Sequence, residues 1–143
     1  MGVGIPYAVA AKLEHPERPV VAICGDFVFG VSAMELETAV RHHVPIVVVV
    51  ANNDGNGGSR RHRMYLGDGG HEPIMMFQPG LRYDRIMEVF GGYAEHVQRP
   101  EGVRPALARA IASNRPACIN VAVDPDAAFP GDTRVPRSHR TRP

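Results

Sequence analysis

Residues 20–55 carry the pattern that decides the fold, and they read VVAICGDFVFGVSAMELETAVRHHVPIVVVVANNDG. Two continuous apolar runs frame this stretch, Val20–Cys24 at its start and Pro45–Ala51 near its end. Short β-branched runs that end at glycine or polar residues are typical of strands buried on both faces of a parallel sheet. Between them, Ser32–His42 has apolar residues at helical spacing, which predicts a helix that connects the two strands.

The start of that connecting helix is predicted from a capping box. Ser32 is the expected N-cap residue, and Glu35 follows three positions later, so each side chain could bond the backbone amide of the other residue. The amide groups at this helix N-terminus would also favour a bound anion.

The rest of the chain continues the alternation of strands and helices. Periodicity predicts helices at 5–13, 83–90 and 100–113, a short strand at 93–97 and a buried strand at 117–123. This order predicts an α/β fold in which helices flank both faces of a parallel sheet. Residues 52–80 are glycine-rich and aperiodic, and we expect a long loop there that is either functional or mobile. We expect one domain over residues 1–130 and a basic, disordered tail over 131–143.

The composition indicates a soluble domain. The chain has 143 residues, 44% of them hydrophobic, and a net charge of +1, which gives no support to binding of nucleic acid or of an acidic membrane surface. The most apolar stretch, Val44–Ala51, is far shorter than the roughly 20 residues that span a bilayer, so we expect a cytoplasmic protein outside membranes. Cys24 and Cys118 stand alone in apolar stretches, which predicts two buried, reduced thiols.

Polar residues follow two of the predicted strands. Gly25 and Asp26 come directly after the first, and Asn52–Gly55 comes directly after the second. Ligands of open α/β sheets bind at the carboxyl ends of the strands, so Asp26 and Asn53 face one crevice if the strands are neighbours. Carboxylate, amide and carbonyl oxygens are hard ligands that suit Mg²⁺ and leave positions for phosphate oxygens and water.

On these residues the chain resembles the thiamine diphosphate (ThDP) enzymes, whose motif is a Gly-Asp turn followed at a fixed interval by Asn-Asn. The interval from Asp26 to Asn53 is the one that the family pattern expects, and the resemblance extends from MGVGIP through GLRYDRIMEVFGG to RPACINVAVDPDA. It is nearest to oxalyl-CoA decarboxylase, 2-hydroxyacyl-CoA lyase and acetolactate synthase-like proteins. The resemblance implies the ThDP-binding fold of the diphosphate-binding (PP-type) domain, with an N-terminus that is incomplete relative to the family.

The resemblance also implies the site residues. Asp26 and Asn53 would give side-chain oxygens to Mg²⁺, and Gly55 would give its main-chain carbonyl. The implied cofactor-binding residues are Met1, Gly25, Asp26, Phe27, Val28, Val31, Asn53 and Gly55.

Three of these residues have roles that bear on cofactor affinity. Met1 would support the bent cofactor near its thiazolium ring, and the backbone amides of Phe27 and Val28 would face the diphosphate. The family commonly has small or hydroxyl residues at the last two positions, so we expect weaker diphosphate binding here. The Met75–Phe77 cluster is interpreted as packing.

The resemblance assigns no catalytic residue to this chain. Family catalysis needs a glutamate from a separate pyrimidine-binding domain, so we expect a chain that is inactive alone and works with a pyrimidine-domain subunit or a homologous chain in a homo- or hetero-oligomer. The implied activity is that of a carbon–carbon lyase, decarboxylase or ligase, within the lyases or transferases, on 2-keto acids or acyl-CoA substrates.

Two other functions stay open at this point. The chain could be a truncated, non-catalytic remnant that acts only as a binding or oligomerisation module. An unrelated nucleotide-binding α/β domain is disfavoured, because the sequence has no Walker or Rossmann glycine pattern.

Overall fold

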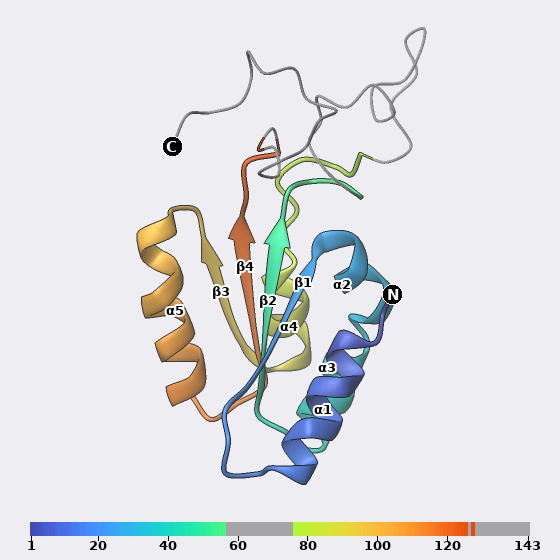
Figure 1. Ribbon diagram of the computed structural model, residues 1–143, viewed down its shortest axis with the longest axis vertical. Helices are drawn as coiled ribbons and strands as arrows, with labels where there is room; N and C mark the ends of the chain where they lie inside the picture. The colour runs from blue at the N-terminus through green and yellow to red at the C-terminus, as the bar shows by residue number, and fades with distance from the viewer. Residues whose placement is uncertain (57–75, 126, 128–143) are drawn as a thin grey trace, which may run out of the picture.

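The core of the protein is a sheet of four parallel strands in the order β1-β2-β4-β3. A computed structural model describes residues 1–56, 76–125 and 127. The strands of this part are β1 (Val20–Gly25), β2 (Ile46–Asn52), β3 (Tyr93–Val97) and β4 (Ala117–Ala122). Figure 1 shows the strands running toward the same end of the molecule. The two runs that frame the motif pair directly, with Gly25 opposite Ala51, so the predicted sheet is confirmed.

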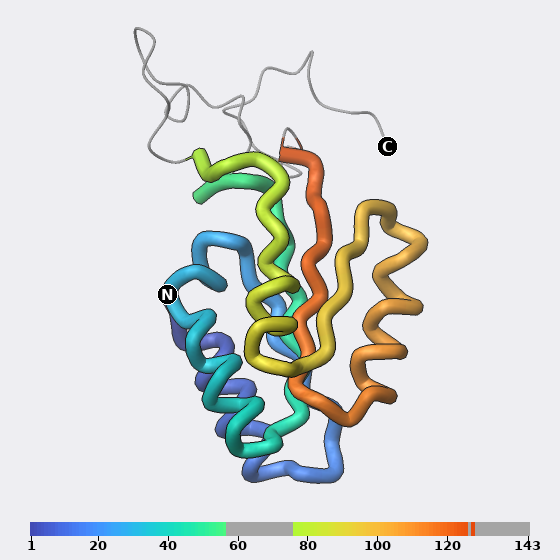
Figure 2. The backbone as a smooth tube through the Cα atoms, turned by 180° about the vertical axis from the view of Figure 1, so that it is seen from behind, coloured from blue at the N-terminus to red at the C-terminus, as the bar shows by residue number. Residues whose placement is uncertain are grey.

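Helices cover both faces of this sheet (Figures 1 and 2), as predicted. The helices are α1 (Gly4–Glu14), α2 (Asp26–Ser32), α3 (Glu35–Arg41), α4 (Asp84–Phe90) and α5 (Pro100–Ala112). α1 to α4 share one hydrophobic core, which contains Phe29 and Met87. α5 covers the opposite face, where Ala106 packs with Ile119.

Strand β2 lies between β1 and β4, and both of its faces are covered. Val48 and Val50 belong to the core under α1 to α4, whereas Val47 belongs to the core under α5. Successive side chains of a strand point to opposite faces, so a nearly continuous run of valines supplies both cores at once. β2 ends at Asn52, so residues 53–55 follow it at the edge of the sheet.

The segment after β1 differs from the prediction. Asp26–Ser32 is helical, so Ser32 ends α2 and does not begin the connecting helix. The predicted capping box is therefore wrong: α3 begins at Glu35 after Met34, which makes no side-chain cap hydrogen bond. The glycine and β-branched residues of DFVFGVS have low intrinsic helix propensity, and tertiary packing overrides it because the side chain of Phe29 is fully buried in the core.

Other predictions have mixed outcomes. Asn52 belongs to β2, so the loop expected at 52–80 begins later, and residues 57–75 of that loop lie outside the described residues. The tail expected at 131–143 lies outside them as well. Both cysteines are free, but only Cys118 is buried, and Cys24 is half-buried. Within residues 1–56 and 76–125, no helix is long and apolar enough to cross a membrane.

An ion pair between partly exposed Arg82 and the buried carboxylate of Asp84 stabilises the chain where it enters α4. The carboxylate of Asp84 accepts hydrogen bonds from Arg82 Nε at 2.8 Å and from Arg82 Nη2 at 2.5 Å. Burial alone would raise the pKa of Asp84, but the hydrogen bonds and the charge of Arg82 outweigh it and hold the pKa below the ordinary 3.8. The pair therefore stabilises the folded state wherever Asp84 is ionised.

We expect Arg82→Met to lower the free energy of unfolding by about 2 kcal/mol at neutral pH, because it leaves the buried carboxylate of Asp84 without the partly exposed guanidinium that pairs with it. The folded-state pKa of Asp84 is lowered, so its stabilisation is complete above 3.8 and is lost as pH falls through the folded-state pKa. Chemical denaturation should show a difference from the wild type that shrinks as pH falls below 3.8. Arg41→Met, which breaks an exposed pair with Glu37, is the control and should change little. Equal losses in both variants would contradict the assignment.

Candidate functional site

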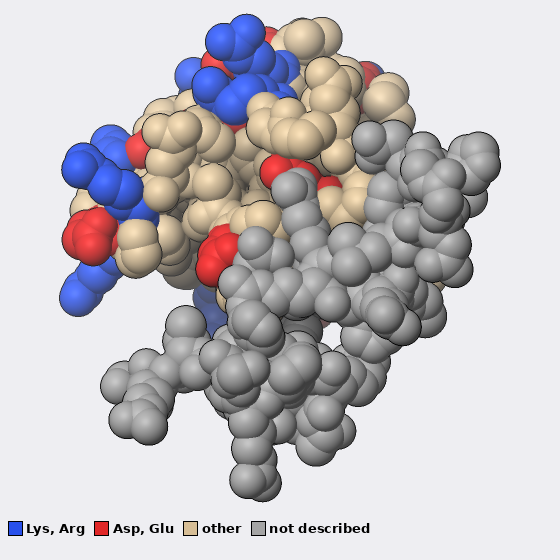
Figure 3. Space-filling model, turned by 90° about the horizontal axis from the view of Figure 1, so that it is seen from above, with Lys and Arg blue, Asp and Glu red and all other residues tan. Residues whose placement is uncertain are grey.

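The candidate site lies at the carboxyl ends of β1 and β2. Asp26 follows β1 directly, and Asn53 follows β2 directly. Because the two strands are paired in parallel, these residues come to the same edge of the sheet, as expected from the motif. Figure 3 views this end of the molecule, where Lys and Arg gather toward the margin and Asp and Glu atoms lie among uncharged residues nearer the middle of the visible surface.

Asp26 is the centre of the site, and its side chain is buried. The residue is 2% exposed, and each carboxylate oxygen accepts a backbone hydrogen bond. Oδ1 accepts from the amide of Phe27 at 2.8 Å, and Oδ2 accepts from the amide of Gly55 at 2.9 Å. The second bond connects the end of β1 to the loop that follows β2. The two halves of the motif are thus joined through this carboxylate.

The charge of Asp26 is poorly compensated. Burial raises its pKa above the ordinary 3.8, and the amides of Gly55 and Phe27 only partly oppose that rise. The nearby charge of Asp54 raises the pKa further. Within residues 1–56 and 76–125, no Lys, Arg or His forms an ion pair with Asp26. Burying an ionised carboxylate without a positively charged partner costs free energy, and a bound cation would lower that cost.

The oxygen groups around Asp26 suit a hard divalent cation. An ionised carboxylate has about four acceptor positions, so its amide hydrogen bonds leave room for a metal. The predicted set adds the side-chain oxygen of half-buried Asn53 and the carbonyl of buried Gly55. No cluster of three His, Cys, Asp or Glu residues occurs in the described part of the chain, so a metal here would depend on amide and carbonyl oxygens besides Asp26. Mg²⁺ accepts such ligands, and the residues present fit it.

An apolar cavity of about 600 Å³ opens beside Asp26. Phe27 and Val31 line it from α2, and Phe77 and Leu81 line it from the chain that precedes α4. The ring of Phe27 stacks on that of Phe77, with centroids 6.3 Å apart and planes inclined by 23°. A cavity with apolar walls and one carboxylate at its edge suits an organic ligand that also carries a charged group or a bound cation.

The predicted site residues do not all lie equally close to Asp26 and the cavity beside it. Met1 is 88% exposed, but its neighbour Gly2 packs on Val31, since a Cβ at Gly2 would lie 2.6 Å from Val31 Cγ1. Gly25 occupies the N-cap position of α2, next to Asp26. Val28 is half-buried in α2 and is not among the residues that line the cavity.

Several residues of the site were missed by sequence reasoning. Met76 and Phe77 line the cavity, although their cluster was interpreted as packing; Met75 lies outside the described residues. Leu81 and Tyr83 also line it, and no motif in the sequence singles them out. In the sequence, these residues are marked only by the apolar side chains that reappear before α4. Apolar character alone does not distinguish the wall of a cavity from a hydrophobic core.

Known proteins resemble this chain over most of its length. A family model described as "Thiamine pyrophosphate enzyme, C-terminal TPP binding domain" matches residues 1–121. The acetolactate synthase large subunit of Mycobacterium tuberculosis is 45% identical over 130 residues, which cover 91% of this chain and 23% of that protein. The 2-hydroxyacyl-CoA lyase of Oryza sativa subsp. japonica is 44% identical over 130 residues, which cover 89% of this chain and 22% of that protein.

Two further matches agree with these. The oxalyl-CoA decarboxylase of Escherichia coli K12 is 38% identical over 133 residues, which cover 89% of this chain and 22% of that protein. Among solved structures, the thiamine diphosphate-dependent 4-hydroxybenzoylformate decarboxylase of Rhodococcus jostii RHA1 superposes with a TM-score of 0.67 at 26% identity, covering 88% of this chain and 23% of that one. The chain thus spans about a quarter of the length of the relatives it matches.

The two buried aspartates should titrate in opposite directions in the metal-free protein. Carboxyl ¹³C NMR should find the pKa of Asp26 above 3.8, because burial outweighs its amide hydrogen bonds, and that of Asp84 below 3.8, because of Arg82. A raised folded-state pKa means that the folded chain holds the Asp26 proton more tightly. The contribution of Asp26 to the free energy of unfolding therefore falls as pH rises from 3.8 through its folded-state pKa. A pKa at or below 3.8 for Asp26 would show that its charge is already compensated.

Proposed function

The chain belongs to the thiamine pyrophosphate enzymes, through their C-terminal TPP-binding domain, and from that premise we propose that Asp26, Asn53 and Gly55 hold Mg²⁺ against the diphosphate of ThDP. The family predicted from the motif is confirmed, and so is its cofactor, because this domain binds TPP in enzymes that use it with Mg²⁺. The assignment of individual ligands is the proposal.

One observation carries this proposal: a buried carboxylate that accepts a hydrogen bond from the Gly55 amide at 2.9 Å and has no ion-pair partner within residues 1–56 and 76–125. A divalent cation at Asp26 would neutralise the carboxylate and attract the negatively charged diphosphate in turn. The hydrogen bond also holds the Gly55 peptide next to Asp26, which supports the assignment of the Gly55 carbonyl as a further ligand. Asn53, two residues earlier, would complete the protein's share of an octahedron whose other positions go to phosphate oxygens and water.

The diphosphate is proposed to lie at the start of α2. This helix begins at Asp26, directly after β1, so its first amides lie at the edge of the sheet where the site is. The first amides of a helix lack partners within the helix and carry a partial positive charge. Since the Phe27 amide donates to Asp26, we assign the diphosphate contact to the amide of Val28 and its successors. The apolar cavity beside Val31 would hold less polar parts of the cofactor.

The proposed reaction class is cleavage or formation of a carbon–carbon bond next to a carbonyl. Bound ThDP supplies the electron sink for such chemistry, and the matched relatives are named as a synthase, a lyase and a decarboxylase. We propose 2-keto acids or acyl-CoA compounds as substrates. This chain's own residues would bind and orient the cofactor, while a pyrimidine-binding domain on another subunit would supply the catalytic glutamate.

Isothermal titration of ThDP into the purified chain tests the proposed site. We expect binding in Mg²⁺ that disappears in EDTA, because the diphosphate is held through the cation. Asp26→Ala should weaken Mg²⁺-dependent binding by more than about tenfold, since it removes a ligand and its charge.

The control variant is Glu14→Ala, which removes an exposed carboxylate from the far end of α1 and should leave the affinity unchanged. Binding that persists in EDTA, or that survives Asp26→Ala, would contradict the proposed metal ligands. Circular dichroism of both variants distinguishes a lost site from a lost fold.

A second arm of the titration separates the enzyme-subunit proposal from a non-catalytic binding module. If the chain works with a pyrimidine-binding domain, adding the matching subunit should raise ThDP affinity and produce turnover of a 2-keto acid or an acyl-CoA substrate. Unchanged affinity and no turnover with that subunit would favour the binding module, even if Mg²⁺-dependent binding is present.

A further inference from the structure

We propose that Asn52 is a positioning residue, which fastens the loop that carries the proposed metal ligands Asn53 and Gly55 to the segment that precedes α4. The inference rests on the proposed function for its meaning, but its geometry is a property of the chain alone. It gives Asn52, the first residue of the Asn-Asn pair, a role distinct from that of its neighbour.

Asn52 is held rigidly at the end of β2. The residue is 6% exposed, and its backbone carbonyl accepts a hydrogen bond from the amide of Val123 at 2.8 Å. Its side chain uses both of its polar atoms. Nδ2 donates to the carbonyl of Leu81 at 3.0 Å, and Oδ1 accepts from the amide of Asp54 at 3.1 Å. One side chain thus fixes the direction of the loop that leaves β2 and binds that loop's base to a segment 29 residues away.

Asp54 continues the same fastening two residues later. Its carbonyl accepts from the amide of Phe77 at 2.9 Å, and its Oδ1 accepts from the amide of Gly80 at 2.9 Å. Asp54 has a left-handed backbone, with φ at 58°, which aspartate tolerates better than most residues but which still needs support. The loop therefore alternates: Asn52 and Asp54 bind it to the chain before α4, while Asn53 and Gly55 are the proposed ligands.

Asn52 affects the proposed metal site through the Gly55 amide, which follows the Asp54 amide that Asn52 binds. The Asn52 side chain holds the amide of Asp54, and the next amide along the chain, that of Gly55, donates to Asp26 Oδ2 at 2.9 Å. Without Asn52, the left-handed turn at Asp54 loses its anchor on β2 but keeps its hydrogen bonds to Phe77 and Gly80, so the Gly55 amide is held less firmly against the carboxylate. Both proposed loop ligands would then move relative to Asp26.

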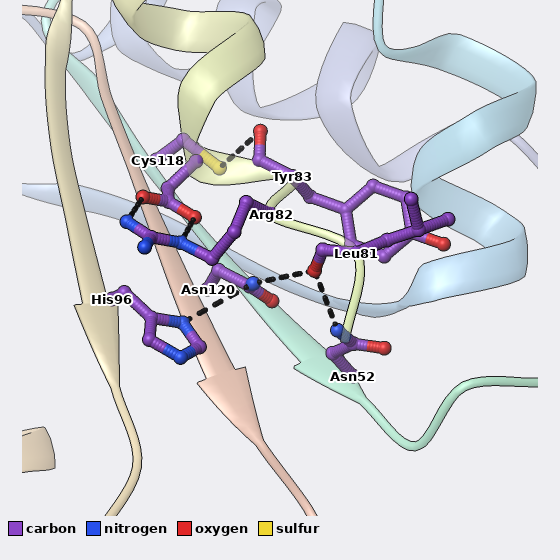
Figure 4. Close-up of polar contacts among 8 residues, drawn as sticks. Asn52, Leu81, Arg82, Tyr83, His96, Cys118 and Asn120 are labelled. Atoms are coloured by element: carbon purple, nitrogen blue, oxygen red, sulfur yellow. Dashed lines mark hydrogen bonds and ion pairs between the residues drawn. The ribbon is translucent and has the colours of Figure 1, made fainter. Parts of the chain in front are cut away.

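Asn120 provides an internal control (Figure 4). It lies on β4, is fully buried, and donates its Nδ2 to the same Leu81 carbonyl at 3.0 Å. Figure 4 shows the amides of Asn52 and Asn120 converging on Leu81 from two strands, with His96 on the far side of Asn120. Asn120 Nδ2 also lies 3.3 Å from His96 Nδ1, so within the described residues the Asn120 side chain shares the Leu81 anchor of Asn52 and makes no hydrogen bond to residues 53–55.

The first measurement is hydrogen exchange of the Gly55 amide by NMR in cofactor-free protein. Asn52→Ala should speed the exchange of Gly55 relative to the slowest core amides by roughly tenfold, the factor that corresponds to loss of about one hydrogen bond. Asn120→Ala should leave the Gly55 amide as protected as in the wild type, although it also removes a buried donor to Leu81. Asn52→Leu and Asn120→Leu repeat the comparison at nearly constant side-chain size, in case the cavities left by alanine unfold either variant.

The second measurement is the Mg²⁺-dependent titration of ThDP into the same four variants. The inference predicts a loss of affinity for both Asn52 variants and none for the Asn120 variants. Equal protection of Gly55 in the Asn52 and Asn120 variants would overturn it. If the wild type binds no ThDP while Gly55 protection still depends on Asn52 alone, the positioning role holds and the proposed function fails.

Discussion

The hydrogen bond from the Gly55 amide to the Asp26 carboxylate joins the ends of two neighbouring strands, and the rest of the candidate site depends on it. It exists because β1 and β2 are paired in parallel, so that the residues following both strands meet at one edge. It also brings a charge into a buried position where the protein provides amide dipoles but no cation in the described part of the chain. A bound cation would supply the positive charge next to Asp26.

Two buried aspartates show how differently the same side chain is used. Asp84 has Arg82 against both oxygens, so its pKa is held low and its charge stabilises the entry into α4. Among the described residues Asp26 accepts hydrogen bonds from backbone amides, and burial outweighs them, so its pKa is raised and its charge opposes folding in the absence of a ligand. Uncompensated charge that costs stability is characteristic of binding and catalytic positions. The contrast distinguishes the carboxylate of Asp84, which is paired within the protein, from that of Asp26, which we propose binds a cation.

Sequence reasoning reached the sheet and the two strand ends because valine runs such as Ile46–Val50 have few alternatives to a buried strand. It failed at α2, where Ser32 and Glu35 matched a local capping pattern but burial of Phe29 decided the structure. It also could not find the side chains that fasten the site. The contact from Asn52 to Leu81 spans 29 residues, and no local pattern encodes a contact over that separation. The motif therefore located the proposed ligands, and only the tertiary structure identified what holds them.

We propose that Asp26, Asn53 and Gly55 together bind one metal ion. The most direct measurement is a crystal structure of the chain with ThDP and Mn²⁺, which accepts the same hard oxygen ligands as Mg²⁺ and gives an anomalous signal. We expect one anomalous peak in contact with a carboxylate oxygen of Asp26, the side-chain oxygen of Asn53 and the carbonyl oxygen of Gly55. A peak elsewhere, or ThDP bound with no metal at Asp26, would contradict it.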